Sequence, residues 1–204
     1  MTKMPISVDK FPSVPTLKYS DARSQIRSGD ILMCSGDNWY SDLIKFATGS
    51  IWSHVGFILR LDIIDRIVVL ESVEKIGVRM VPLSFYMNNY EGKGKPYDGK
   101  ILIARHDDFK NAHTTNLAKK AIDLLGHNYD SNEIAKITTR IALSKFKSDD
   151  ECKFPEPNNA FICSEYGYEC FTSMGIHVNH DCRGFVTPAD FAKTKEVNAV
   201  CEIR

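Results

Sequence analysis

Short runs of apolar and β-branched residues dominate the first half of the chain, and they predict a β-sheet. Gly, Pro, Asn, Asp and Ser residues bound these runs, as is typical of strands. The polar residues 61–66 separate two adjacent runs and indicate a hairpin. The runs together predict a small antiparallel sheet, with strands at residues 31–34, 54–60, 67–71, 78–83 and 101–104.

Other segments carry apolar residues at the three- and four-residue spacing of an amphipathic helix. A glycine follows three of these segments and is a common residue at helix ends. Helices interspersed with an antiparallel sheet predict one α+β domain over residues 21–204, preceded by an extended leader over residues 1–20. The predicted helices span residues 39–47, 111–125, 131–146 and 163–174.

The composition excludes several classes of protein. Among 204 residues, 26 Lys and Arg balance 26 Asp and Glu, whereas a nucleic-acid-binding domain usually carries a basic excess. Charged residues interrupt the most apolar stretch, residues 54–70, so we expect no transmembrane segment. The N-terminal residues hold no apolar run of signal-peptide length, which predicts a cytoplasmic or otherwise non-secreted protein. Six cysteines without a CxxC pair indicate reduced thiols.

Cys163 stands at the expected start of a helix, directly after the apolar residues 160–162. The free N–H groups and the dipole at a helix N-terminus favour a thiolate over a thiol, and they can also hold an oxyanion. A buried, unreactive cysteine is the alternative interpretation.

His54 begins a predicted strand, and the next strand contains Glu71. If Arg60 pairs with Ile67 across the hairpin, Gly56 faces Glu71. Glu71 is then the diagonal neighbour of His54 on the same face of the sheet. A slip of one residue would turn Glu71 to the opposite face. In the predicted register, Glu71 orients and charges the His54 imidazole, which in turn activates Cys163.

Seven short motifs, in this order along the chain, resemble the circularly permuted papain-like hydrolases of the NlpC superfamily, in particular the YiiX-type amidases. In unpermuted relatives the cysteine precedes the histidine, whereas here His54 precedes Cys163, as a circular permutation would produce. The matching motifs are residues 29–32 (Gly-Asp-Ile-Leu), 53–56 (Ser-His-Val-Gly), 70–72 (Leu-Glu-Ser), 77–78 (Gly-Val), 129–130 (Tyr-Asp), 163–165 (Cys-Ser-Glu) and 187–190 (Thr-Pro-Ala-Asp).

This resemblance implies a permuted papain-like fold and a Cys163-His54-Glu71 triad. Cys163 would be the nucleophile, His54 the general base and acid, and Glu71 the orienting group. Tyr129 and Ser164 become candidate substrate-binding residues. The implied reaction is amide hydrolysis through an acyl-thioester, with no metal or organic cofactor, on a small peptide or an amino-acid conjugate such as a cell-wall fragment.

Two alternatives differ in function class. Lipid-directed relatives of the lecithin:retinol acyltransferase type share the histidine-before-cysteine order but surround the nucleophile with Asn-Cys-Glu-His. Residues 162–165 read Ile-Cys-Ser-Glu instead, although a lipid-like ester or amide substrate stays open. A catalytically inactive binding or virion-associated module is the non-enzymatic alternative, because a fold does not determine a function.

Two further segments have competing interpretations. Cys170, His177, His180 and Cys182 are possible zinc ligands, but their spacing lacks the paired motifs of common structural zinc sites. The charged segment 147–159, which leads towards Cys163, is either a lid over the site or a solvated connector.

Overall fold

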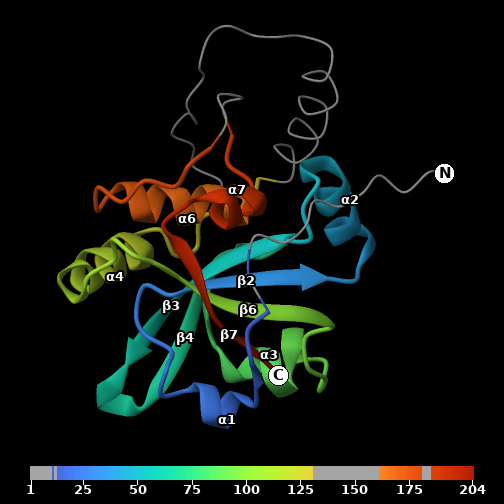
Figure 1. The fold of residues 1–204 in the computed structure, drawn as a ribbon, viewed down its shortest axis with the longest axis horizontal. Coiled ribbons are helices and arrows are strands. Elements are labelled where there is room, and N and C mark those ends of the chain that lie inside the picture. The colour runs from blue at the N-terminus through green and yellow to red at the C-terminus, as the bar shows by residue number, and fades with distance from the viewer. Residues whose placement is uncertain (1–10, 12, 131–160, 181–184) are drawn as a thin grey trace, which may run out of the picture.

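A mixed sheet of seven strands, in the order β1-β7-β6-β2-β3-β4-β5, runs through the centre of the computed structural model (Figure 1). The structure describes residues 11, 13–130, 161–180 and 185–204. All neighbouring strands are antiparallel except β1 and β7, which are parallel. The strands are β1 (Thr16–Leu17), β2 (Ile31–Gly36), β3 (His54–Leu61), β4 (Arg66–Val73), β5 (Gly77–Pro82), β6 (Gly99–His106) and β7 (Val197–Ile203).

Helices cover both faces of the sheet, which confirms the α+β class. In Figure 1, α4, α6 and α7 lie above the sheet, and α1 and α3 lie below it. No helix in the described ranges is long and apolar enough to cross a membrane. The helices are α1 (Tyr19–Ala22), α2 (Trp39–Thr48), α3 (Ser84–Asn88), α4 (Thr114–Asp123), α6 (Cys163–Thr172) and α7 (Pro188–Lys193), with single 3-10 turns at Asp62–Ile64, Tyr90–Gly92 and Asn111–His113.

The five predicted strands and three of the predicted helices are present, with shifted ends. The expected helix over residues 131–146 and the segment 147–159 lie outside the described residues. The sheet is larger than expected, because β7 pairs with β6 and also carries β1 along its outer edge. Part of the expected leader therefore joins the fold: residues 16–17 are extended and pair with β7, whereas residues 19–22 form α1.

The alternation of side chains along β3 divides the apolar core between the two faces of the sheet. Val55, Phe57 and Leu59 join the cluster that contains residues of α4, α6 and α7. Ile58 joins the cluster on the other face, which contains residues of α1 and α3. Successive residues of one strand thus reach different layers of the molecule.

Helix α6 is held against β3 and α4 by a buried aromatic residue, Tyr166. Its ring stacks on Phe57 of β3 with 5.3 Å between ring centroids, and its hydroxyl donates a 3.1 Å hydrogen bond to the Ala121 carbonyl of α4. Stacked aromatic pairs contribute about 0.5–1.5 kcal/mol beyond their area burial. These contacts fix the axis of α6, and hence where its first residue lies.

Asp30 anchors the turn that leads into β2. Its side chain is buried and accepts hydrogen bonds from Arg105 Nε at 2.6 Å, Arg105 Nη2 at 2.9 Å and the Arg27 backbone N–H at 2.7 Å. The carboxylate thereby links the turn to β6. The aspartate of the motif at residues 29–32 therefore has a structural role.

Replacement of Asp30 by Ala should lower the free energy of unfolding by about 3 kcal/mol, because Arg105 loses its charged acceptor in a partly buried place. Urea titration followed by tryptophan fluorescence measures this loss. Asp62 is the matched control, since its 2.6 Å ion pair with Arg60 is exposed. Asp62→Ala should change the free energy of unfolding by less than about 1 kcal/mol. Equal losses in the two variants would contradict the anchoring role.

Candidate active site

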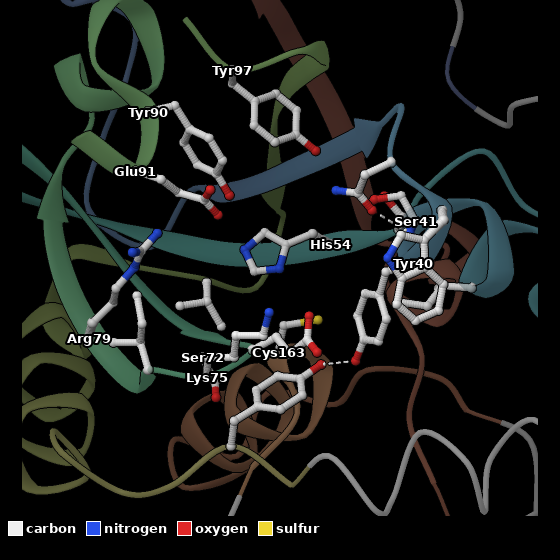
Figure 2. Close-up of a pocket in the computed structure, with 18 of the residues that line it drawn as sticks. Tyr40, Ser41, His54, Ser72, Lys75, Arg79, Tyr90, Glu91, Tyr97 and Cys163 are labelled. Atoms are coloured by element: carbon white, nitrogen blue, oxygen red, sulfur yellow. Dashed lines mark hydrogen bonds between the residues drawn. The ribbon is translucent and has the colours of Figure 1, made fainter. Parts of the chain in front are cut away.

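A pocket of about 740 Å³ opens where β3 and α6 both begin, and His54 and Cys163 line it together (Figure 2). Helix α2 forms one wall, the β4–β5 hairpin another, and aromatic residues between α3 and β6 a third. The pocket therefore gathers side chains from segments that are far apart in the sequence.

The predicted register of the β3–β4 hairpin is confirmed. Arg60 pairs with Ile67, and His54 Nε2 lies 2.6 Å from Glu71 Oε2. Gly56 stands between them, and a Cβ atom at this position would lie 3.2 Å from the Glu71 Cβ. The absence of a side chain at residue 56 thus allows the two strands to bring imidazole and carboxylate into contact.

The carboxylate of Glu71 is fully buried, at 0% exposure, and meets two further partners. Arg79 approaches Oε1 with Nε at 2.9 Å and Nη2 at 2.8 Å, and the Tyr86 hydroxyl donates a 2.5 Å hydrogen bond to Oε2. Burial raises the pKa of Glu71, but the hydrogen bond and charge of His54, with Arg79 and Tyr86, outweigh burial and lower it below its usual value. Glu71 is therefore ionised at neutral pH.

Cys163 is the first residue of α6, as the sequence predicts. The preceding residues are fixed from both sides: Ser72 Oγ donates a 2.6 Å hydrogen bond to the Phe161 carbonyl, and Glu165 accepts one from the Ile162 N–H at 3.3 Å. The cysteine is 4% exposed and lines the pocket. N–H groups in the first turn of a helix lack intrahelical acceptors, so this end of α6 can accommodate negative charge.

The electrostatics of His54 favour a protonated imidazole. Burial lowers the pKa of His54, but the neighbouring Cys163 sulfur and the Glu71 carboxylate have the larger, opposite effect. Together they raise the pKa of His54 to about 10. Because Glu71 occupies Nε2, Nδ1 is the ring nitrogen left for the thiol. His54 thus stands between a buried anion and a thiol, an arrangement suited to transferring a proton.

Of the two candidate substrate-binding residues, one lines the pocket and the other does not. Tyr129 lines the pocket, and its hydroxyl lies 2.7 Å from that of Tyr40 on α2. Burial raises the pKa of both phenols well above the usual value, so both hydroxyls are neutral, and one donates a hydrogen bond to the other. Ser164 is fully buried, does not line this pocket, and donates a 2.7 Å hydrogen bond to the Val186 carbonyl. Its hydroxyl therefore secures α6 to the segment before α7.

Three of the residues considered as zinc ligands, Cys170, His177 and His180, do not line this pocket. Cys170 is buried in the core, whereas His177 is exposed. The Nε2 atom of His180 lies 3.3 Å from the Tyr168 hydroxyl, and Cys182 is outside the described residues. Within the described part of the chain, no group of three or more His, Cys, Asp or Glu side chains is placed to hold a metal ion.

Three residues that contact Glu71 or Tyr129 were not identified from the sequence. Arg79 had a usable signal, because the short β4–β5 turn pairs residues 73 and 77, and this register sets Arg79 directly opposite Glu71. No pattern in the sequence indicated Tyr86 or Tyr40. Tyr86 reaches Glu71 from the short helix α3, and Tyr40 reaches Tyr129 from α2, so both contacts depend on tertiary packing.

Comparison with known proteins identifies the fold and the family of the chain. A crystal structure of the metalloprotein YiiX from Escherichia coli O157:H7 has the same fold, with a TM-score of 0.63 and 18% sequence identity over 87% of this chain and 98% of that chain. No curated protein sequence matches the chain. Residues 25–182 match the family described as permuted papain-like amidase enzyme, YaeF/YiiX, C92 family. The chain therefore belongs to this family of permuted papain-like amidases.

Proposed function

We propose that this protein is a cysteine amidase in which Cys163 is the nucleophile, His54 the general base and acid, and Glu71 the group that orients and charges His54. The 2.6 Å contact between His54 and Glu71, together with the pocket that His54 and Cys163 line, carries this proposal. Membership of the permuted papain-like amidases supports amide hydrolysis as the reaction class. Peptides and amino-acid conjugates are the proposed substrates.

The first half of the reaction acylates the thiol. With the Cys163 proton already held on His54 as an imidazolium, the Cys163 thiolate attacks the amide carbonyl carbon to form a C–S bond. Negative charge develops on the carbonyl oxygen, and the N–H groups at the start of α6 stabilise it. The imidazolium then gives its proton to the amide nitrogen, the C–N bond breaks, and an amine leaves.

The second half releases the acid. His54 takes a proton from water, the hydroxide attacks the thioester carbon, and the C–S bond breaks. The products are a carboxylic acid and the free thiol, so atoms and charges balance without a co-reactant other than water. Throughout the cycle, Glu71 stabilises the positive imidazolium and holds its ring in one orientation.

Iodoacetamide labelling, mapped to individual cysteines by mass spectrometry, tests the proposed pair. At pH 7, Cys163 should react fastest, and His54→Ala should slow its labelling about tenfold or more, because the thiolate loses its cation. Cys34 is an internal control: it lies opposite His54 on β2, and burial raises its pKa well above the usual value. Its labelling should be slow in both proteins.

Labelling of Cys163 that does not respond to His54→Ala would contradict the proposal and favour a binding module. A panel of N-acyl amino acids and short peptides then tests the reaction itself. Amine release by the wild type, lost in Cys163→Ala and in His54→Ala, is the expected result.

The stability of the protein in acid tests the charge on Glu71. Since its pKa is lowered in the folded state, its stabilisation is complete above the ordinary value of 4.5 and is lost as the pH falls through the lower folded-state value. The free energy of unfolding should therefore fall more steeply below about pH 4.5 in the wild type than in Glu71→Gln. Parallel curves for the two proteins in urea titrations would contradict an ionised, paired Glu71.

A further inference from the structure

Lys75 brings a positive charge to the active-site pocket from the turn between β4 and β5. This turn comprises residues 74–76 and is closed by a 3.2 Å hydrogen bond from the Ile76 N–H to the Val73 carbonyl. Lys75 lines the same pocket as His54 and Cys163, and Figure 2 shows its side chain on the hairpin side of that pocket.

Lys75 differs from Arg79 and Lys93, the other Lys and Arg side chains that line the pocket, in having no carboxylate partner. Arg79 is bound to Glu71 at 2.8 Å, and Lys93 is bound to Glu91 at 2.6 Å. Among the described residues, Lys75 makes no hydrogen bond or ion pair. An ammonium group has three donors and no acceptor, so this charge is available to an anionic ligand.

Glu74 is the acidic neighbour of Lys75, and it also lines the pocket. Its charge acts on the hydrogen-bonded pair of Tyr40 and Tyr129, because it contributes to their raised pKa values. The two residues therefore present opposite charges to the pocket, and no ion pair joins them in the described structure.

The backbone of Lys75 is strained, which is a second and independent observation. Its φ angle is 68°, in the left-handed region that favours glycine and asparagine. A lysine fits this turn position poorly, although Asn or Gly would fit well. Strained residues of this kind cluster at active sites and ligand-binding sites.

We propose that Lys75 binds a free carboxylate of the substrate, so that the pocket selects acidic amides such as N-acyl amino acids or peptides with a carboxylate near the scissile bond. This inference rests on the proposed function, because it names the substrate class of the same site. The carboxylate would lie on the hairpin side, where the His54 imidazolium adds to the attraction.

Two alkylating reagents that differ only in charge test the proposal without a known substrate. N-iodoacetylglycine carries a carboxylate a few bonds beyond the reacting carbon, and N-iodoacetylglycinamide is its neutral counterpart. The measured quantity is the ratio of their second-order rate constants at Cys163, at low salt. Lys75→Gln should lower this ratio about three- to tenfold, and added salt should lower it in the wild type.

Two matched variants separate a local charge from the net charge of the protein. Lys119 is exposed on α4 and does not line the pocket. Lys119→Gln should therefore keep the wild-type ratio, and Lys75→Arg should retain most of it because the charge remains. A ratio in Lys75→Gln equal to that of the wild type, or an equal decrease in Lys119→Gln, would overturn the proposal.

Lys75→Asn tests the strain and the charge together. It should lower the reagent ratio as Lys75→Gln does, yet raise Tm by about 1–4 °C, because Asn tolerates the left-handed conformation. A Tm at or below that of the wild type would overturn the claim that Lys75 is kept for its amine. Failure of the proposed function would give a different result. In that case, His54→Ala would not slow the reaction of Cys163 with either reagent.

Discussion

The active site depends on one buried carboxylate. A charge as deeply buried as that of Glu71 is unfavourable unless other groups compensate for its lost hydration. His54, Arg79 and Tyr86 supply that compensation from β3, β5 and α3. Three elements must therefore meet at a single point, and the imidazole is held there as part of a network that also stabilises the fold.

Strand β4 connects the two halves of the site, because its successive side chains point to opposite faces. Glu71 faces the histidine, and the next residue, Ser72, binds the Phe161 carbonyl two residues before Cys163. One strand thus fixes the position of the histidine and also the position at which the helix of Cys163 begins. Any shift of β4 along β3 would misplace both groups at once.

Local patterns in the sequence were sufficient for the parts of the site that follow from periodicity. Strand alternation and one assumed pair gave the His54–Glu71 contact, and the helical pattern gave the position of Cys163. Tyr86 and Tyr40 were beyond such reasoning, since each comes from a helix whose placement is set by packing. Strand β7 was missed because the polar residues Asn198 and Glu202 interrupt its apolar pattern, although pairing with β6 and β1 stabilises it.

The parallel pairing of β1 with β7 has a consequence for chain topology. It brings residues 16–19 next to residues 202–204, with a 3.0 Å hydrogen bond from the Tyr19 N–H to the Arg204 carbonyl. A short linker between these residues, with the chain reopened ahead of α6, would place the cysteine before the histidine and keep every strand pair. The order of the two residues along the chain is therefore independent of their geometry, and one fold accommodates either connectivity.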